Sequence, residues 1–194
     1  FEAPTVAGIA DFLTSAAAEG QPFARPQLLP VSREGRLPLS FAQERLWLLE
    51  QLEPGSTAYS MPAALRLSGP LKISALERIL SQLIQRHEVL RTSYAVFNGQ
   101  PEQFIASGEN LSHPVIDLED GYPDEKEFAL QQLIQEEHYR PFVFEQGPLF
   151  LVTLLRLDPE EHVLLLVLHH IISDGLSLSI LFQEVATGYD ADSH

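Results

Sequence analysis

Two adjacent histidines followed by an aspartate–glycine pair are the residues best suited to chemistry in this chain. They lie in the segment His169–Gly175, which reads HHIISDG. An apolar run that predicts a buried strand precedes the segment, and a stretch with helical periodicity follows it. Such strand ends are where α/β proteins build their sites. Because imidazole titrates near neutral pH, a histidine placed here can take up or release a proton during a reaction.

The two histidines are expected to have different roles. Side chains alternate along a strand, so His169 and His170 point to opposite faces, and only one can face a given cavity. We expect His170 to open into a channel as the catalytic group and His169 to be packed as structural support. The alternative is that one histidine is packed and hydrogen-bonded and that neither is catalytic. The opposite directions disfavour a shared metal ion, and no metal ligand is assigned.

The residues around the histidines have supporting roles in this interpretation. Asp174 is either a catalytic carboxylate or the partner of an arginine that holds the turn, and we favour the second reading. Gly175 allows a backbone or a ligand to approach closely. Ser173, Leu176 and Ser177 are expected near the channel and the substrate. The sequence has neither the Gly-x-Ser-x-Gly elbow of serine hydrolases nor a phosphate-binding loop.

Two capping boxes predict the starts of helices that support this segment. Ser40 is followed three residues later by Gln43, and Ser74 by Glu77. In each case the serine can cap a helix while the third residue bonds back to the cap. An apolar stripe at helical spacing follows the second box and predicts an amphipathic helix.

Strand signals complete the expected fold. The dipeptide Asn98-Gly99 between apolar runs predicts a β-hairpin. The strand predicted over His162–His170 is apolar on both faces, which indicates a central position in its sheet. Further strands are predicted at 59–67 and 149–157, and further helices at 4–17, at 124–138 and after residue 175. We therefore predict an α/β (α+β) fold, a mixed sheet with helices packed on it.

Composition excludes several classes of function. The chain has 194 residues, 12 basic and 27 acidic residues, a net charge of -15 and no cysteine. An acidic surface disfavours nucleic acid and anionic membranes as partners, and the missing cysteines exclude disulfides and thiolate metal sites within the chain. No apolar run approaches the length of a membrane helix. We expect a cytoplasmic protein. Because the chain does not begin with Met, we also expect it to come from a longer one.

Three segments together resemble the condensation domains of nonribosomal peptide synthetases. HHxxxDG is shared by these domains and by chloramphenicol acetyltransferase-like folds. Leu39–Leu49 resembles the first core motif of the condensation domains and Arg86–Tyr94 the second. The motifs occur in the family's order, and the resemblance covers about residues 36–194. The first two look most like the class that joins an L-configured donor to an L-configured acceptor.

The resemblance implies a chloramphenicol acetyltransferase-like lobe at 38–194 that is the N-terminal half of a two-lobed domain, with the C-terminal lobe absent. Residues 1–17 resemble the last helix of a peptidyl carrier domain, and 18–37 read as a proline-interrupted linker. An arginine of the second motif is implied as the partner of Asp174, with Arg91 favoured over Arg86. Two departures from the family pattern are Leu176, where Trp is frequent, and Tyr94, where Phe is frequent.

The implied reaction is amide bond formation between a carrier-bound donor thioester and an acceptor amine, in secondary metabolite biosynthesis such as that of antibiotics and toxins. His170 would act as general base or would position the amine. No cofactor is bound directly, because the substrates arrive on the 4′-phosphopantetheine of upstream and downstream carrier domains, and the parent chain would include an adenylation domain. We expect the isolated chain to be inactive. The alternatives are another HHxxxDG acyltransferase using coenzyme A, an epimerisation domain, or a non-catalytic interaction module.

Overall fold

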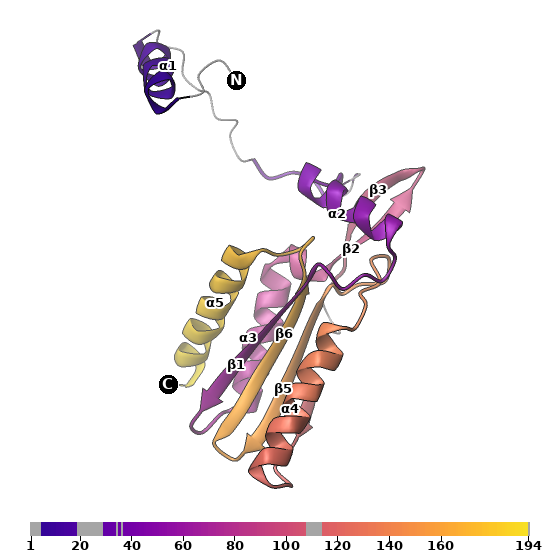
Figure 1. Ribbon diagram of the computed structural model, residues 1–194, viewed down its shortest axis with the longest axis vertical. Helices are drawn as coiled ribbons and strands as arrows, with labels where there is room; N and C mark the ends of the chain where they lie inside the picture. Colours follow the sequence, from indigo (N-terminus) through magenta and orange to yellow (C-terminus); the bar gives the residue numbers. More distant parts are fainter. Residues whose placement is uncertain (1–4, 19–28, 34, 36, 108–113, 194) are drawn as a thin grey trace. The chain divides into compact units, whose positions relative to one another are not determined.

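The strand that leads to the two histidines lies inside a four-stranded sheet in the computed structural model. This strand, β6 (Glu161–His169), pairs antiparallel with β1 (Ser60–Ser68) on one side and with β5 (Phe150–Asp158) on the other. A short strand, β4 (Val115–Asp117), runs parallel to β5, so the order is β1-β6-β5-β4 (Figure 1). The predicted central position of β6 is confirmed, and residues 162–169 are all buried.

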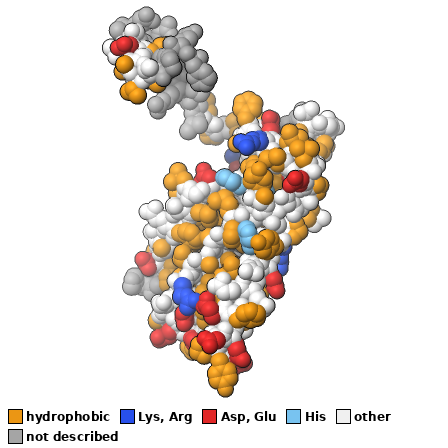
Figure 2. All heavy atoms as spheres, in the orientation of Figure 1, with side chains coloured by type: hydrophobic (Ala, Val, Ile, Leu, Met, Phe, Trp, Pro, Cys, Tyr) orange, Lys and Arg blue, Asp and Glu red, His pale blue; other side chains and the backbone are white. Residues whose placement is uncertain are grey.

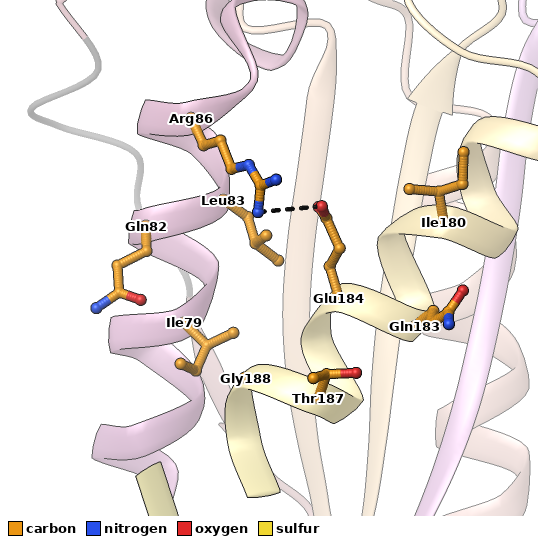
Figure 3. A pocket seen from close by; sticks show the side chains of 9 residues that line it. All are labelled: Ile79, Gln82, Leu83, Arg86, Ile180, Gln183, Glu184, Thr187 and Gly188. Atoms are coloured by element: carbon orange, nitrogen blue, oxygen red, sulfur yellow. Dashed lines mark ion pairs between the residues drawn. The ribbon is translucent and has the colours of Figure 1, made fainter. Parts of the chain in front are cut away.

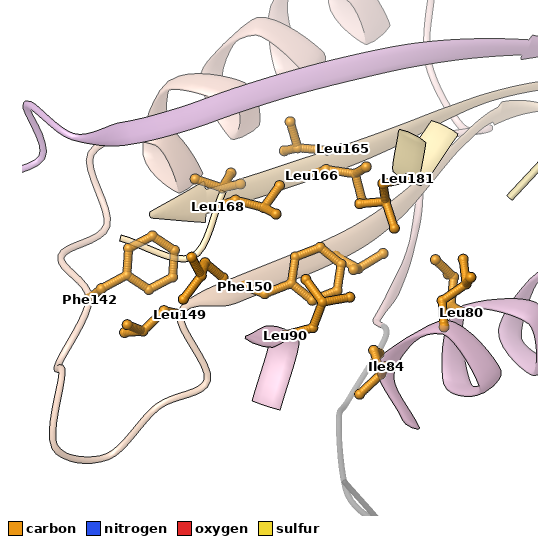
Figure 4. Packing of buried hydrophobic residues seen from close by; sticks show 14 of the residues in the cluster. Leu80, Ile84, Leu90, Phe142, Leu149, Phe150, Leu165, Leu166, Leu168 and Leu181 are labelled. Atoms are coloured by element: carbon orange, nitrogen blue, oxygen red, sulfur yellow. The ribbon is translucent and has the colours of Figure 1, made fainter. Parts of the chain in front are cut away.

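Helices cover both faces of this sheet. On one face, α3 (Ile73–Arg86) and α5 (Gly175–Ser193) lie side by side, while α4 (Pro123–His138) covers the other face (Figure 1). Because side chains alternate along β6, the strand supplies both layers. Leu168 packs with Leu90 and Leu181 on the α3–α5 side (Figure 4). Val163 packs with Leu130 of α4 on the other side. The predicted mixed α/β architecture is confirmed.

Helix α2 (Phe41–Leu52) begins at the predicted capping box. The Gln43 amide donates to the Ser40 hydroxyl at 3.3 Å, and the Ser40 amide donates to the Gln43 side-chain oxygen at 2.9 Å. Two amide groups that have no intrahelical partner are thereby satisfied. The side chain of Gln43 is fixed in place by the same contact.

The β-hairpin has the turn that its sequence predicts. Strand β2 (Thr92–Phe97) pairs with β3 (Gln100–Ile105) as a separate two-stranded sheet, preceded by the short 3-10 helix η1 (Glu88–Arg91). The connecting residues Asn98 and Gly99 have φ values of 50° and 78°. A two-residue turn with positive φ at both positions is type I′, and Asn-Gly favours it because both residues tolerate that conformation.

One sequence expectation about these elements needs correction, and one strand had no prediction. Helix α3 starts at Ile73, and its cap position is Lys72, without a side-chain cap, so Ser74 lies inside the first turn. The start is set by a tertiary contact, because the Lys72 amide donates to the Tyr189 hydroxyl of α5 at 2.8 Å. Strand β4 was not expected, because its three residues are too few to show a period.

The structure describes residues 5–18, 29–33, 35, 37–107 and 114–193, and the chain divides into two compact units, Phe1–Gly35 and Arg36–His194. The first unit contains α1 (Val6–Ala18), in agreement with the predicted helix at 4–17, and Thr5 accepts from the Gly8 amide at its start. Most of the predicted linker at 18–37 lies outside the described residues. None of the helices in the described ranges is long and apolar enough to cross a membrane.

The type I′ turn gives a first prediction. Gly99→Ala should lower the free energy of unfolding by about 1 kcal/mol, because a side chain at this positive φ meets its own backbone. Urea unfolding followed by circular dichroism measures the change. Gly35→Ala is the control, since Gly35 has no positive φ and an added Cβ meets no atom within 4 Å. Equal stability of the two variants would contradict the turn assignment.

Candidate active site

The histidine segment forms a tight turn between β6 and α5. Strand β6 ends at His169, and the turn begins at His170, whose amide donates to the Tyr59 carbonyl at 2.8 Å. The Ile172 amide donates to the His169 carbonyl at 3.0 Å and closes the turn. The polar main chain at the end of this buried strand is therefore satisfied by the protein itself, which holds the turn in one conformation.

His170 projects from this turn with an exposed side chain. Its Nδ1 lies 2.7 Å from the Ser173 carbonyl oxygen. A carbonyl can only accept, so Nδ1 carries the hydrogen, and in the neutral ring Nε2 keeps a free lone pair. The turn thus selects the tautomer of His170 that can accept a proton or a hydrogen bond at Nε2.

His169 lies in the opposite environment, with 2% of its surface exposed. Its Nδ1 accepts from the Ile171 amide at 3.1 Å, and its ring packs edge-on against Phe142 and Phe144. Burial, together with the neighbouring His170, lowers the pKa of His169 to about 4. The ring is therefore neutral at working pH and holds the turn from inside. The expected difference in direction between the two histidines is present.

Asp174 caps helix α5. Its Oδ1 accepts from the amide of Ser177 at 2.7 Å and from the Ser177 hydroxyl at 2.6 Å. These hydrogen bonds hold the pKa of Asp174 below its ordinary value. The expected ion pair with an arginine is not formed among the described residues. The reason is that the amide groups and the positive dipole end of α5 already stabilise the carboxylate.

The two arginines considered as partners are used elsewhere in the described structure. Arg91 donates to the carbonyls of Ala106 and, at 3.3 Å, Gln85, and so ties the loop after β3 to the end of α3. Arg86 forms an ion pair with Glu184 of α5, with 3.3 Å between Nη1 and Oε1. The preference for Arg91 as the partner of Asp174 is thus corrected.

The other predicted site residues divide into buried and open positions. Ser173 is 7% exposed, and its hydroxyl donates to the His169 carbonyl at 3.3 Å. Ser173 and Ser177 therefore support the turn and the helix start. Leu176 is 70% exposed. A Cβ added to Gly175 would meet no atom within 4 Å, so the close approach expected there is not made by the described residues.

Sequence reasoning missed two groups that contact this region. Glu184 accepts from His87 at 2.5 Å as well as pairing with Arg86, and so links the end of α3 to α5. The Tyr94 hydroxyl reaches the turn itself, 3.5 Å from the Ile171 carbonyl. Neither contact can be predicted from the hydrophobic periodicity of the sequence. The one available signal was the hydroxyl of Tyr94, at a position where the family often has Phe.

Three cavities lie between the elements around the turn. An open groove of about 500 Å³ lies between α3 and α5, with the Arg86–Glu184 pair at its edge (Figure 3). A smaller cavity of about 180 Å³ lies beneath the turn, next to Ile172 and Ser173. A third, of about 290 Å³, lies between α2 and the His169 side of the sheet. His170 lines none of these three, and its ring is directed to the exposed side of the turn.

The mixed sheet, the exposed histidine at a strand end and the capped helix behind it define an α/β lobe of the acyltransferase type. Residues 33–194 match the condensation domain family. The chain belongs to this family, the condensation domains of nonribosomal peptide synthetases.

Similar proteins include two synthases from bacteria. The chain is 47% identical over 191 residues to a linear gramicidin synthase of Brevibacillus parabrevis, covering 98% of this chain and 4% of that protein. It is 35% identical over 193 residues to surfactin synthase subunit 1 of Bacillus subtilis (strain 168), covering 100% of this chain and 5% of that protein. The chain therefore spans a few per cent of the length of these relatives.

Solved structures with the same fold include condensation domains. The starter condensation domain of rhizomide synthetase has a TM-score of 0.74 and 29% identity, covering 81% of this chain and 39% of that one. The X-domain in its complex with OxyB from teicoplanin biosynthesis has a TM-score of 0.76 and 28% identity, covering 87% of this chain and 35% of that one. In both cases this chain matches less than half of the solved chain.

The buried neutral ring of His169 gives a pH prediction. Between about pH 4 and 6.5 the unfolded chain binds a proton on this histidine and the folded chain does not. Stability is therefore lost as the pH falls through this range, by about 2–3 kcal/mol between pH 7 and pH 4.5. Urea unfolding at several pH values measures it. His169→Gln, which keeps an acceptor for the Ile171 amide but does not titrate, should show a correspondingly smaller loss. The same pH dependence in both proteins would contradict the assignment.

Proposed function

We propose that this chain is the N-terminal lobe of a condensation domain that forms an amide bond between a carrier-bound donor thioester and an acceptor amine. The observation that supports this proposal most directly is the hydrogen bond between His170 Nδ1 and the Ser173 carbonyl, at 2.7 Å. It leaves Nε2 free on an exposed side chain. A base prepared in this way, at the end of a buried strand, suits proton transfer to or from a substrate held outside the turn.

The reaction requires a base positioned next to the attacking amine. An α-amine has an ordinary pKa of about 7.7–8.0, so most of it must lose a proton before or during attack. Nε2 of His170 can accept that proton, or can accept a hydrogen bond that orients the amine. The amine nitrogen forms a bond to the thioester carbonyl carbon, and the thiol of the carrier arm leaves. Because the thioester is already activated, placing the two substrates end to end provides much of the rate.

Solved relatives support thioester substrates. One rhizomide synthetase starter condensation domain variant, 28% identical to this chain, was crystallised in complex with C8-CoA and Leu-SNAC. We infer that this chain likewise meets substrates presented as thioesters, delivered on the 4′-phosphopantetheine of an upstream and a downstream peptidyl carrier domain. An adenylation domain in the parent chain would load them. We assign the L-donor, L-acceptor class from the likeness of the first two motifs alone.

The first unit fits the tail of the upstream carrier domain. The match to the linear gramicidin synthase covers 191 residues and so extends well before residue 33, where the condensation domain match begins. Helix α1 has an exposed apolar face that includes Val6, Ile9 and Leu13. Such a face is expected of a helix that packs on further parts of a small domain.

A second lobe would cover apolar side chains that this chain exposes. Figure 2 shows hydrophobic side chains gathered where α2 and the β2–β3 hairpin meet. Phe41 is 91% exposed, and Leu52 and Phe97 are 69% and 52% exposed. Patches of this kind mark interaction surfaces. We assign this apolar face, together with Leu176 beside the turn, to the missing C-terminal lobe.

Removing the His170 ring should slow condensation strongly without unfolding the protein. In the full condensation domain, His170→Ala should lower the rate of amide formation by about 100-fold or more, the usual contribution of a general base. His170→Asn is the matched variant, because it keeps a donor for the Ser173 carbonyl but lacks a second ring nitrogen. Product formation is followed by mass spectrometry of carrier-bound substrates, and thermal unfolding checks the fold. A rate within a few fold of the wild type in both variants would contradict a catalytic role for His170, whereas no product from the wild-type domain itself would favour a non-catalytic module.

The isolated chain should form no amide bond. The proposed channel needs a second wall, and the turn exposes His170 to solvent rather than enclosing it. Carrier-bound donor and acceptor are incubated with the chain alone and with the complete two-lobed domain. We expect product from the complete domain only. Product from the chain alone would show that one lobe holds the whole site.

A further inference from the structure

The residue directly after His170 is held at both ends by side chains. The Ile171 amide donates to His169 Nδ1 at 3.1 Å, and the Ile171 carbonyl accepts from the Tyr94 hydroxyl at 3.5 Å. The two contacts come from different elements, the end of β6 and the strand β2. The Ile171 amide and carbonyl are therefore contacted by one neighbouring side chain and by one residue 77 positions away.

Tyr94 is placed to do this in a defined direction. Its side chain is fully buried, and its amide donates to the Phe144 carbonyl at 2.8 Å. The Gln43 side-chain amide lies 3.0 Å from the Tyr94 hydroxyl. An amide nitrogen can only donate, so the hydroxyl accepts from Gln43 and directs its own hydrogen toward the Ile171 carbonyl. Burial raises the pKa of Tyr94, so the hydroxyl keeps this hydrogen at working pH.

Gln43 is in turn fixed by the start of α2. Its side-chain oxygen accepts from the Ser40 amide at 2.9 Å, and its side-chain nitrogen donates to Tyr94. The hydrogen bonds therefore form one chain, from the cap of α2 through Gln43 and Tyr94 to Ile171. In this chain the Gln43 oxygen accepts, the Gln43 nitrogen donates, and the Tyr94 hydroxyl accepts from Gln43 and donates to Ile171.

We infer that the Tyr94 hydroxyl is a positioning group for His170. It restrains the Ile171 carbonyl, and so the turn that brings the Ser173 carbonyl to His170 Nδ1. A phenylalanine here would leave the Gln43 amide and the Ile171 carbonyl without this partner in a buried place, which loosens the turn. The catalytic consequence rests on the proposed amide-forming function, whereas the structural one does not.

The test is Tyr94→Phe, which keeps the ring and the packing. Two-bond nitrogen–proton spectra of the chain, with labelled histidine, report which nitrogen of His170 carries the hydrogen. We expect the wild type to show the Nδ1–H tautomer and the variant to show a mixture of both. In the full condensation domain, kcat should fall about fivefold to tenfold, as for the loss of one positioning hydrogen bond, with KM for both carrier substrates little changed.

Tyr189→Phe is the matched control. It also removes a hydroxyl contact between elements, the 2.8 Å bond from the Lys72 amide, but far from the turn. It should lower stability and leave both the His170 spectrum and kcat unchanged. Gln43→Leu should change the His170 spectrum less in the Tyr94→Phe variant than it does in the wild type. The reason is that Gln43 and Tyr94 act on the turn through one contact.

A His170 spectrum that is the same in Tyr94→Phe and in the wild type would overturn the inference, whatever the rates. An equal change in Tyr189→Phe would overturn it as well, since the effect would then be general loosening. Failure of the proposed function is seen separately, because in that case the wild-type domain forms no amide bond while the spectra still report on the turn.

Discussion

The hydrogen bond from His170 Nδ1 to the Ser173 carbonyl is the interaction on which the site depends, and it exists only because the turn between β6 and α5 is tight. A buried strand that ends inside a protein must find partners for its last polar groups. Here the partners are close in space but come from several elements: the Tyr59 carbonyl, the His169 carbonyl and side chain, and the Tyr94 hydroxyl. The Ser173 carbonyl accepts from the imidazole of His170.

The two histidines illustrate how burial divides identical side chains into different roles. The ring of His169 is enclosed by aromatic rings, and burial makes its charged form costly, so it acts as a neutral acceptor for a backbone amide. The ring of His170 lies outside the same turn and keeps solvent on one side. The order of the two residues along the strand therefore determines which ring is exposed and open to a substrate.

Much of the fold could be predicted from local pattern, because the relevant information is local. The Ser40 capping box, the Asn98-Gly99 turn and the apolar run of β6 each depend on residues within a few positions of one another. The start of α3 was misplaced because Tyr189, from the other end of the chain, fixes the Lys72 amide. The partner of Asp174 was wrong for a related reason: a carboxylate directly before a helix finds its donors in that helix before it needs an arginine.

The part of the site that sequence could not supply is the connection among the three motifs. Ser40 and Gln43 belong to the first motif, Tyr94 to the second and Ile171 to the third, and they meet only once β2 and the cap of α2 lie against the turn. A capping glutamine would be satisfied by its own helix, and a buried tyrosine by any acceptor, so neither residue alone predicts the other. Their roles follow from donor and acceptor directions. The Gln43 amide donates to the Tyr94 hydroxyl, so this hydroxyl is free to donate its own hydrogen to another group. The acceptor within reach is the Ile171 carbonyl beside His170. Placement of the His170 ring is thereby linked to a helix start more than 120 residues earlier in the chain.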